Sequence, residues 1–168
     1  MIPSVVILAL VTLQRLAELL WSRRNTSRLL AAGAVEHGSA HYPLLVALHA
    51  SWLAGLWLLA WDRPLIWSWL AAYAGLQALR VWVLMTLGQR WTTRIIVPAG
   101  KELVRTGPYR FMSHPNYAVV AAEIAILPLA FGMIWYALLF TILNAAVLMV
   151  RVRAENAALA AFVQDDAR

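Results

Sequence analysis

The sequence contains no cysteine and few charged residues. Only 13% of its 168 residues are charged, and acidic residues number eight against fourteen basic ones. Without cysteine, disulfide bonds, thiolate zinc sites and a cysteine nucleophile are all excluded. His37 and His41 supply too few ligands for a metal site by themselves, so we expect no metal.

Hydrophobic residues, by contrast, make up 62% of the chain, and nine residues are tryptophan. This composition is typical of membrane proteins, because a soluble domain of this length cannot bury so much apolar surface. The net charge of +6 comes from basic residues that lie between apolar segments. That distribution favours contacts with anionic lipid headgroups, and we expect no nucleic-acid partner.

Five segments are long and apolar enough to predict membrane-spanning helices, which need about 20 residues each. They cover residues 2–21, 42–61, 65–87, 115–131 and 133–150. The first segment lacks a basic leader and a small-residue cleavage site, so it is predicted to be a retained helix. With no internal repeat, the sequence predicts one all-α, membrane-embedded domain over residues 1–168.

The connections between these segments alternate in length and charge. Residues 62–64 and 131–133 are short joints that predict two antiparallel hairpins, whereas residues 22–41 and 88–114 are long and rich in arginine. By the positive-inside rule, the N-terminus should lie outside and the basic loops and C-terminus in the cytoplasm. We expect a multi-pass protein of a bacterial inner membrane.

Several polar residues interrupt the apolar segments. Arg15 and Glu18 are three residues apart and should form an ion pair on one helix face. Arg80 is expected either to extend to the membrane interface or to face a substrate. Tryptophans near the segment ends fit an interfacial aromatic belt, namely Trp21, Trp61, Trp67 and Trp91.

The stretch RTGPYRFMSHPNY, residues 105–117, is polar and basic in this apolar chain. Pro115 favours extended geometry at His114 and is well tolerated in the first turn of a helix, so a helix should begin there. Its unpaired N–H groups would form a weakly positive site, on which Tyr109, Arg110 and His114 could converge with a polar ligand. The alternative is a turn that only contacts lipid headgroups.

A second polar stretch lies near the C-terminus. Asn144, Arg151 and Glu155 are separated by seven and four residues, so they share one face of a helix that continues beyond the membrane. Together with the 105–117 turn, this face could enclose a zwitterionic cofactor. An exposed Arg–Glu pair without function is the alternative.

The two stretches together, LVRTGPYRFMSHPNY and then RVRAENAAL, resemble the isoprenylcysteine carboxyl methyltransferase family. Members carry Gly-Pro-Tyr, then His-Pro-x-Tyr, then Arg-x-x-x-Glu-Glu-x-x-Leu, and the resemblance covers roughly residues 88–160. It implies an integral membrane enzyme that binds S-adenosylmethionine on the cytoplasmic side. The acceptor it implies is a lipid-bearing molecule that enters from the bilayer.

The resemblance also implies a cofactor region at residues 88–117 and 144–160. Its cofactor-binding residues would be Val104, Tyr109, His114, Pro115, Tyr117, Arg151, Glu155 and Asn156. The candidates for catalysis are Glu123, His114 and Arg110, where Glu123 or His114 would act as a base if the acceptor is a phenol. A structural role for Glu123, as partner of Arg80 or Asn144, is the alternative.

Three positions depart from the family pattern. Ser113 replaces an arginine, Val119 replaces a glycine, and Asn156 replaces the second glutamate. The changes at Ser113 and Asn156 alter the charge near acceptor or cofactor, which argues against a prenylcysteine carboxylate. The compact chain and HPNY resemble a bacterial branch whose members are thought to methylate hydroxyls of alkylresorcinols and alkylpyrones.

Two other functions are compatible with the same residues. HPNY followed by Glu123 also resembles NADPH-dependent sterol and steroid reductases, and a basic loop beside a helix start suits phosphate groups. A non-enzymatic membrane scaffold is the other alternative, although the concentration of polar residues at 105–117 argues against a simple anchor.

Overall fold

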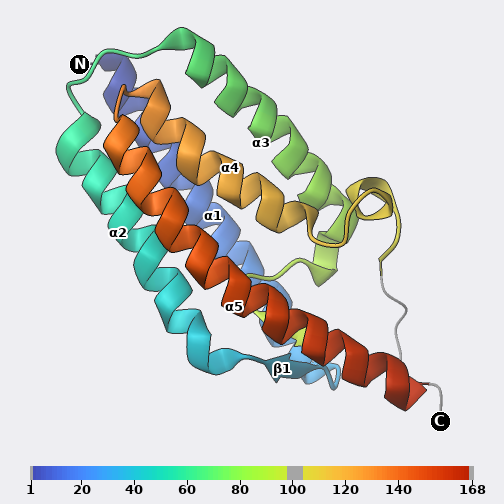
Figure 1. Ribbon diagram of the computed structural model, residues 1–168. Helices are drawn as coiled ribbons and strands as arrows, with labels where there is room; N and C mark the ends of the chain where they lie inside the picture. The colour runs from blue at the N-terminus through green and yellow to red at the C-terminus, as the bar shows by residue number, and fades with distance from the viewer. Residues whose placement is uncertain (1, 98–103, 167–168) are drawn as a thin grey trace.

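The computed structural model describes residues 2–97 and 104–166, with side chains as far as residue 160. Residues 98–103 of the predicted cofactor region therefore lie outside the described residues. The chain forms a bundle of helices with a small sheet at one end (Figure 1). The helices are α1 (Ile2–Ala31), α2 (Tyr42–Ala60), α3 (Trp67–Leu87), α4 (Pro115–Ala130) and α5 (Ile134–Asp166), with 3-10 turns η1 (Ser39–His41), η2 (Gly88–Arg90) and η3 (Gly107–Arg110).

Among the described residues, four helices are long and apolar enough to cross a membrane, namely α1, α2, α3 and α5. This confirms the prediction of a helical, multi-pass membrane protein. The fourth predicted span is α4, which has only 16 residues. At 1.5 Å per residue its length is about 24 Å, against roughly 30 Å for the hydrocarbon core of a bilayer. A fifth crossing therefore stays a prediction.

α4 packs between α3 and α5, with α2 along the far side of α5 (Figure 1). The short connections lie at the end of the bundle where α1 begins, since the Ser4 hydroxyl donates a hydrogen bond to the Arg63 carbonyl at 2.5 Å. Residues 32–41, 88–97 and 104–114 of the long connections lie at the opposite end, beside the C-terminal half of α5 (Figure 1). Large apolar side chains remain exposed along the outer surfaces of the helices, where lipid would cover them.

A two-stranded sheet was not expected from the sequence. Strand β1 (Val35–His37) pairs antiparallel with β2 (Ile95–Val97), so that Val35 lies opposite Val97. The guanidinium of Arg94 lies 2.8 Å from the carboxylate of Glu36 across the pair. Each strand has only three residues and the two are far apart in the chain, so neither shows a strand pattern by itself.

Four charged side chains form a network between α1, α3 and α4. The predicted ion pair of Arg15 with Glu18 is present at 3.3 Å. Arg80 is only 5% exposed and binds both Glu18 and Glu123, the latter at 2.7 Å. The expectation that Arg80 extends to the interface is therefore wrong. Two arginines and two glutamates neutralise each other inside the bundle, so the Arg80 guanidinium does not have to reach water to be stabilised.

Candidate functional site

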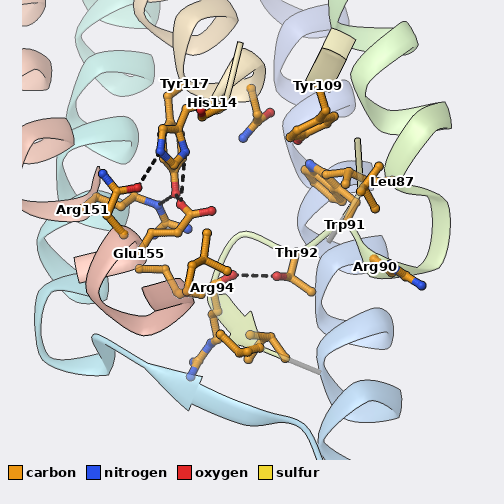
Figure 2. Close-up of a pocket in the computed structure, with 18 of the residues that line it drawn as sticks. Leu87, Arg90, Trp91, Thr92, Arg94, Tyr109, His114, Tyr117, Arg151 and Glu155 are labelled. Carbon is orange, nitrogen blue, oxygen red and sulfur yellow. Dashed lines mark hydrogen bonds and ion pairs between the residues drawn. The ribbon is translucent and has the colours of Figure 1, made fainter. Parts of the chain in front are cut away.

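A cavity of about 720 Å³ opens at the end of the bundle that holds the sheet (Figure 2). Three parts of the chain line it: residues from Leu87 to Val97, residues from Val104 to Tyr117, and the α5 face from Arg151 to Leu159. Leu29 of α1 completes the lining. Segments that are distant in sequence thus meet around one pocket.

One side of the pocket holds a chain of charged and polar contacts (Figure 2). The Arg151 Nε–H donates to the Tyr117 hydroxyl at 2.8 Å, and that hydroxyl donates in turn to the carboxylate of Glu155. The ring of His114 stacks on that of Tyr117, and its Nε2 is hydrogen-bonded to Asn156 Oδ1 at 3.0 Å. A cationic and an anionic side chain are thereby held next to each other.

Local sequence explains how α4 presents these residues. His114 has φ −129° and ψ 59°, outside helical values, and α4 begins at Pro115 as predicted. Gly107 opens η3 with a φ of 56°, in the left-handed region that favours glycine. These two positions turn the chain sharply, so that His114 and Tyr109 both reach the pocket.

The other side of the pocket is more aromatic (Figure 2). Trp91 is 2% exposed and its ring lies 5.5 Å from that of Trp21. The prediction that Trp91 belongs to the interfacial belt is therefore wrong. Burial, and secondarily the negative charge of Glu155, raise the pKa of Tyr109. Its phenol stays protonated at neutral pH and remains a hydrogen-bond donor.

Comparison with known proteins adds the decisive observation. The sequence profile of the isoprenylcysteine carboxyl methyltransferase (ICMT) family matches residues 69–161, which is more than half of the chain. The chain belongs to the ICMT family. The match begins within α3, upstream of the motifs that carried the resemblance.

One curated relative of this ICMT-family chain is the "Uncharacterized protein YpbQ" of Bacillus subtilis (strain 168). The two are 41% identical over 159 residues, which cover 91% of this chain and 94% of the relative. No solved structure was found to match the chain. The similarity to this relative thus extends over nearly the full length of both chains, and the relative's name gives no acceptor.

The structure brings nearly all of the predicted site residues of this ICMT-family chain into one pocket. The predicted site residues that line this pocket are Val104, Tyr109, Arg110, His114, Tyr117, Arg151, Glu155 and Asn156. Pro115 is the exception among the predicted cofactor-binding residues, because its buried side chain lines an adjoining apolar groove.

Glu123 lies apart from the pocket lining. Its side chain is 1% exposed, and its carboxylate lies 2.8 Å from the Arg15 guanidinium as well as 2.7 Å from that of Arg80. These contacts are those of the structural alternative, in which Glu123 is a partner of Arg80. A catalytic role for Glu123 stays a prediction, and no contact between Glu123 and the pocket supports it.

Several lining residues were not singled out from the sequence. Thr92 and Leu29 belong to no motif, and only the fold brings them to the pocket, together with Trp91, which the sequence had assigned to the aromatic belt. Asn116 of HPNY also lines it, and its Oδ1 is buried without a hydrogen-bond partner. An unpartnered buried acceptor is costly, so it marks a position where a ligand donor would be stabilising.

The adjoining groove has a volume of about 310 Å³ and lies between α3, η3 and α4. The turn between Pro108 and Asn116 has two faces: one group of its residues lines the polar pocket and another lines the groove. On the groove side are Pro108, Phe111, Met112 and Pro115, opposite Leu76, Leu79, Trp82 and Val83. An apolar path thus runs beside the polar site, separated from it by one turn of chain.

Within residues 2–97 and 104–166, no group of three or more histidine, aspartate or glutamate residues could hold a metal ion.

Proposed function

We propose that this ICMT-family protein is an integral membrane O-methyltransferase that uses S-adenosylmethionine and acts on a lipophilic acceptor. The observation that carries the proposal is that Arg151 and Glu155, which are joined through the Tyr117 hydroxyl, line a pocket built mostly from residues within the family match. The methionine part of S-adenosylmethionine has a carboxylate and an ammonium group. Arg151 would bind the carboxylate and Glu155 the ammonium group.

Other features of the pocket fit the rest of the cofactor. Its volume of about 720 Å³ lies in the range of small-molecule sites. Tyr109 offers aromatic surface for an adenine ring, and the free Oδ1 of Asn116 offers an acceptor. Bound there, S-adenosylmethionine supplies a methyl group on a positively charged sulfur.

The protein's own contribution is to position the acceptor oxygen, exclude water and manage one proton. His114 lies where the polar pocket meets the start of α4, and in this proposal its ring would take a proton from an acceptor hydroxyl. Arg110 also lines the pocket and would hold an acidic acceptor group by its charge.

The acceptor would approach along the apolar groove, with its alkyl chain between α3 and α4 and its polar head beyond the Pro108–Asn116 turn. Ser113 and Asn156, which replace charged residues of the family pattern, favour a hydroxyl acceptor such as an alkylresorcinol or alkylpyrone over a prenylcysteine carboxylate. We propose that the site faces the cytoplasm, because arginines of the second basic loop line it, namely Arg90, Arg94, Arg105 and Arg110.

Calorimetric titration of the purified protein tests the proposal. S-adenosylhomocysteine should bind and should raise the unfolding temperature by mass action. NADPH serves as the parallel ligand, since Arg90, Arg94 and Arg105 also line the pocket and suit phosphate groups. Binding of NADPH without binding of S-adenosylhomocysteine would overturn the methyltransferase in favour of a reductase, and binding of neither would favour a scaffold.

A further inference from the structure

Thr93 lies between two residues that line the pocket, Thr92 and Arg94, but does not line it itself. All of its polar groups are engaged. Its N–H donates to the Ser22 hydroxyl at 2.7 Å, and its own hydroxyl lies 2.8 Å from that of Ser22 and 3.0 Å from that of Tyr42. Its carbonyl accepts a hydrogen bond from Arg151 at 2.7 Å.

These partners belong to three different helices. Ser22 lies on α1 and is 1% exposed, Tyr42 begins α2, and Arg151 lies on α5. Asn25, one turn beyond Ser22, donates to the carbonyls of Gly88 and Trp91 at 3.2 and 2.8 Å. Side chains of α1 therefore hold the main chain of the 88–93 segment at several points.

Arg151 depends on this segment for its orientation. Its side chain is 4% exposed, and its hydrogen bonds go to the Thr93 carbonyl and the Tyr117 hydroxyl. Two acceptors in different directions fix the plane of a guanidinium group. If the Thr93 carbonyl turned away, Arg151 would keep its charge but lose one of the two bonds that aim it.

We propose that Ser22 and Thr93 are positioning residues for Arg151, through which the first helix of the bundle sets ligand affinity in a pocket that neither residue touches. The Ser22 hydroxyl holds the N–H and hydroxyl of Thr93, and the Thr93 carbonyl holds the guanidinium. The identity of the ligand rests on the proposed function, whereas the coupling of Ser22 to Arg151 does not.

The variants Ser22→Ala and Thr93→Val test this proposal. Each removes one hydroxyl, and we expect S-adenosylhomocysteine to bind on the order of tenfold more weakly. Tyr42→Phe should have a smaller effect, since it removes only one bond to Thr93. Thr12→Val is the matched control: its hydroxyl on α1 is also hydrogen-bonded, to Leu8 and Trp57, but has no contact with the 88–93 segment. Thr12→Val should leave affinity unchanged.

A double-mutant cycle with Arg151→Lys separates positioning from general destabilisation. If Thr93 acts through Arg151, Thr93→Val should weaken binding little further once Arg151 is lysine. Additive losses of affinity would overturn the proposal and leave the methyltransferase assignment intact.

The same cycle on the unfolding temperature needs no ligand and tests the coupling even if S-adenosylhomocysteine fails to bind. Non-additive shifts are expected, and additive shifts would again overturn the proposal. Should Ser22→Ala fail to fold, Thr93→Val and Tyr42→Phe provide the same comparison.

Discussion

Arg151 and Glu155 are the residues on which ligand binding should depend most directly. A hydrogen bond to a charged group contributes about 1.5–3 kcal/mol, which corresponds to about a tenfold to hundredfold change in affinity. Arg151→Ala and Glu155→Gln should each weaken the binding of S-adenosylhomocysteine by that amount, as measured by titration calorimetry.

Arg153 provides the control for these variants. It lies on the exposed side of α5, two residues from Arg151, so Arg153→Ala removes the same charge from the same helix without changing the pocket. Near-normal affinity of both Arg151→Ala and Glu155→Gln would show that the pair is only structural.

Substitution of Glu123 should lower the stability of the fold rather than the affinity for ligand, because the Glu123 carboxylate pairs with two buried arginines. Glu123→Gln leaves Arg15 and Arg80 without part of their countercharge, and breaking a buried pair costs about 3–5 kcal/mol. We expect a large fall in the unfolding temperature and unchanged affinity of the folded fraction for S-adenosylhomocysteine. A stable Glu123→Gln variant that binds this ligand but has lost turnover would instead favour the catalytic role.

At this scale, sequence alone predicted the residues that carry a motif. Four of these residues line the pocket, namely His114, Tyr117, Arg151 and Glu155. They could be predicted because each belongs to a short pattern with fixed spacing. Trp91 and Thr93 could not be predicted in the same way, since their roles depend on contacts with α1 that no local pattern records.

Among the elements, α5 has the clearest functional dependence, because one continuous helix joins the membrane bundle to the pocket. Val150 precedes Arg151 and is well exposed, so its side chain contributes little to packing. Val150→Pro should interrupt the helix at a cost of about 3 kcal/mol and displace Arg151 and Glu155. Binding of S-adenosylhomocysteine should be lost while the protein still inserts into the membrane.

Val150→Ala is the control, because it shortens the same side chain and keeps the helix intact. Equal losses of binding in the two variants would contradict a role for helix continuity.

The boundaries of α2, α3 and α4 were predicted to within two residues, because apolar runs of membrane length leave little freedom in placing a helix. The extension of α1 to Ala31 was not predicted, since residues 22–31 are mostly polar and carry no apolar run. Those residues stay helical because Ser22 and Asn25 are buried against the 88–93 segment, which is a tertiary effect.

For the whole molecule, the central prediction is the topology. Five crossings place the N-terminus outside and the C-terminus in the cytoplasm, whereas four crossings would place both ends on one side. Reporter fusions at the two ends decide between these arrangements, and we expect signals from opposite sides. Signals from the same side would mean that α4 does not cross the membrane.

The shortness of α4 has a consequence for the surrounding lipid. If α4 crosses the membrane as predicted, a helix of about 24 Å would be too short for a hydrocarbon layer of roughly 30 Å, and a bilayer relieves such mismatch by thinning locally. Because α4 starts at Pro115, directly after the pocket residue His114, the thinning would draw the leaflet on that side inward beside the pocket. Lipid headgroups, and the head of an amphipathic acceptor among them, would then already lie near the depth of the site. The protein would in that case deform its own membrane to shorten the acceptor's path, and bilayers of short-chain lipids should suit it better than thick ones.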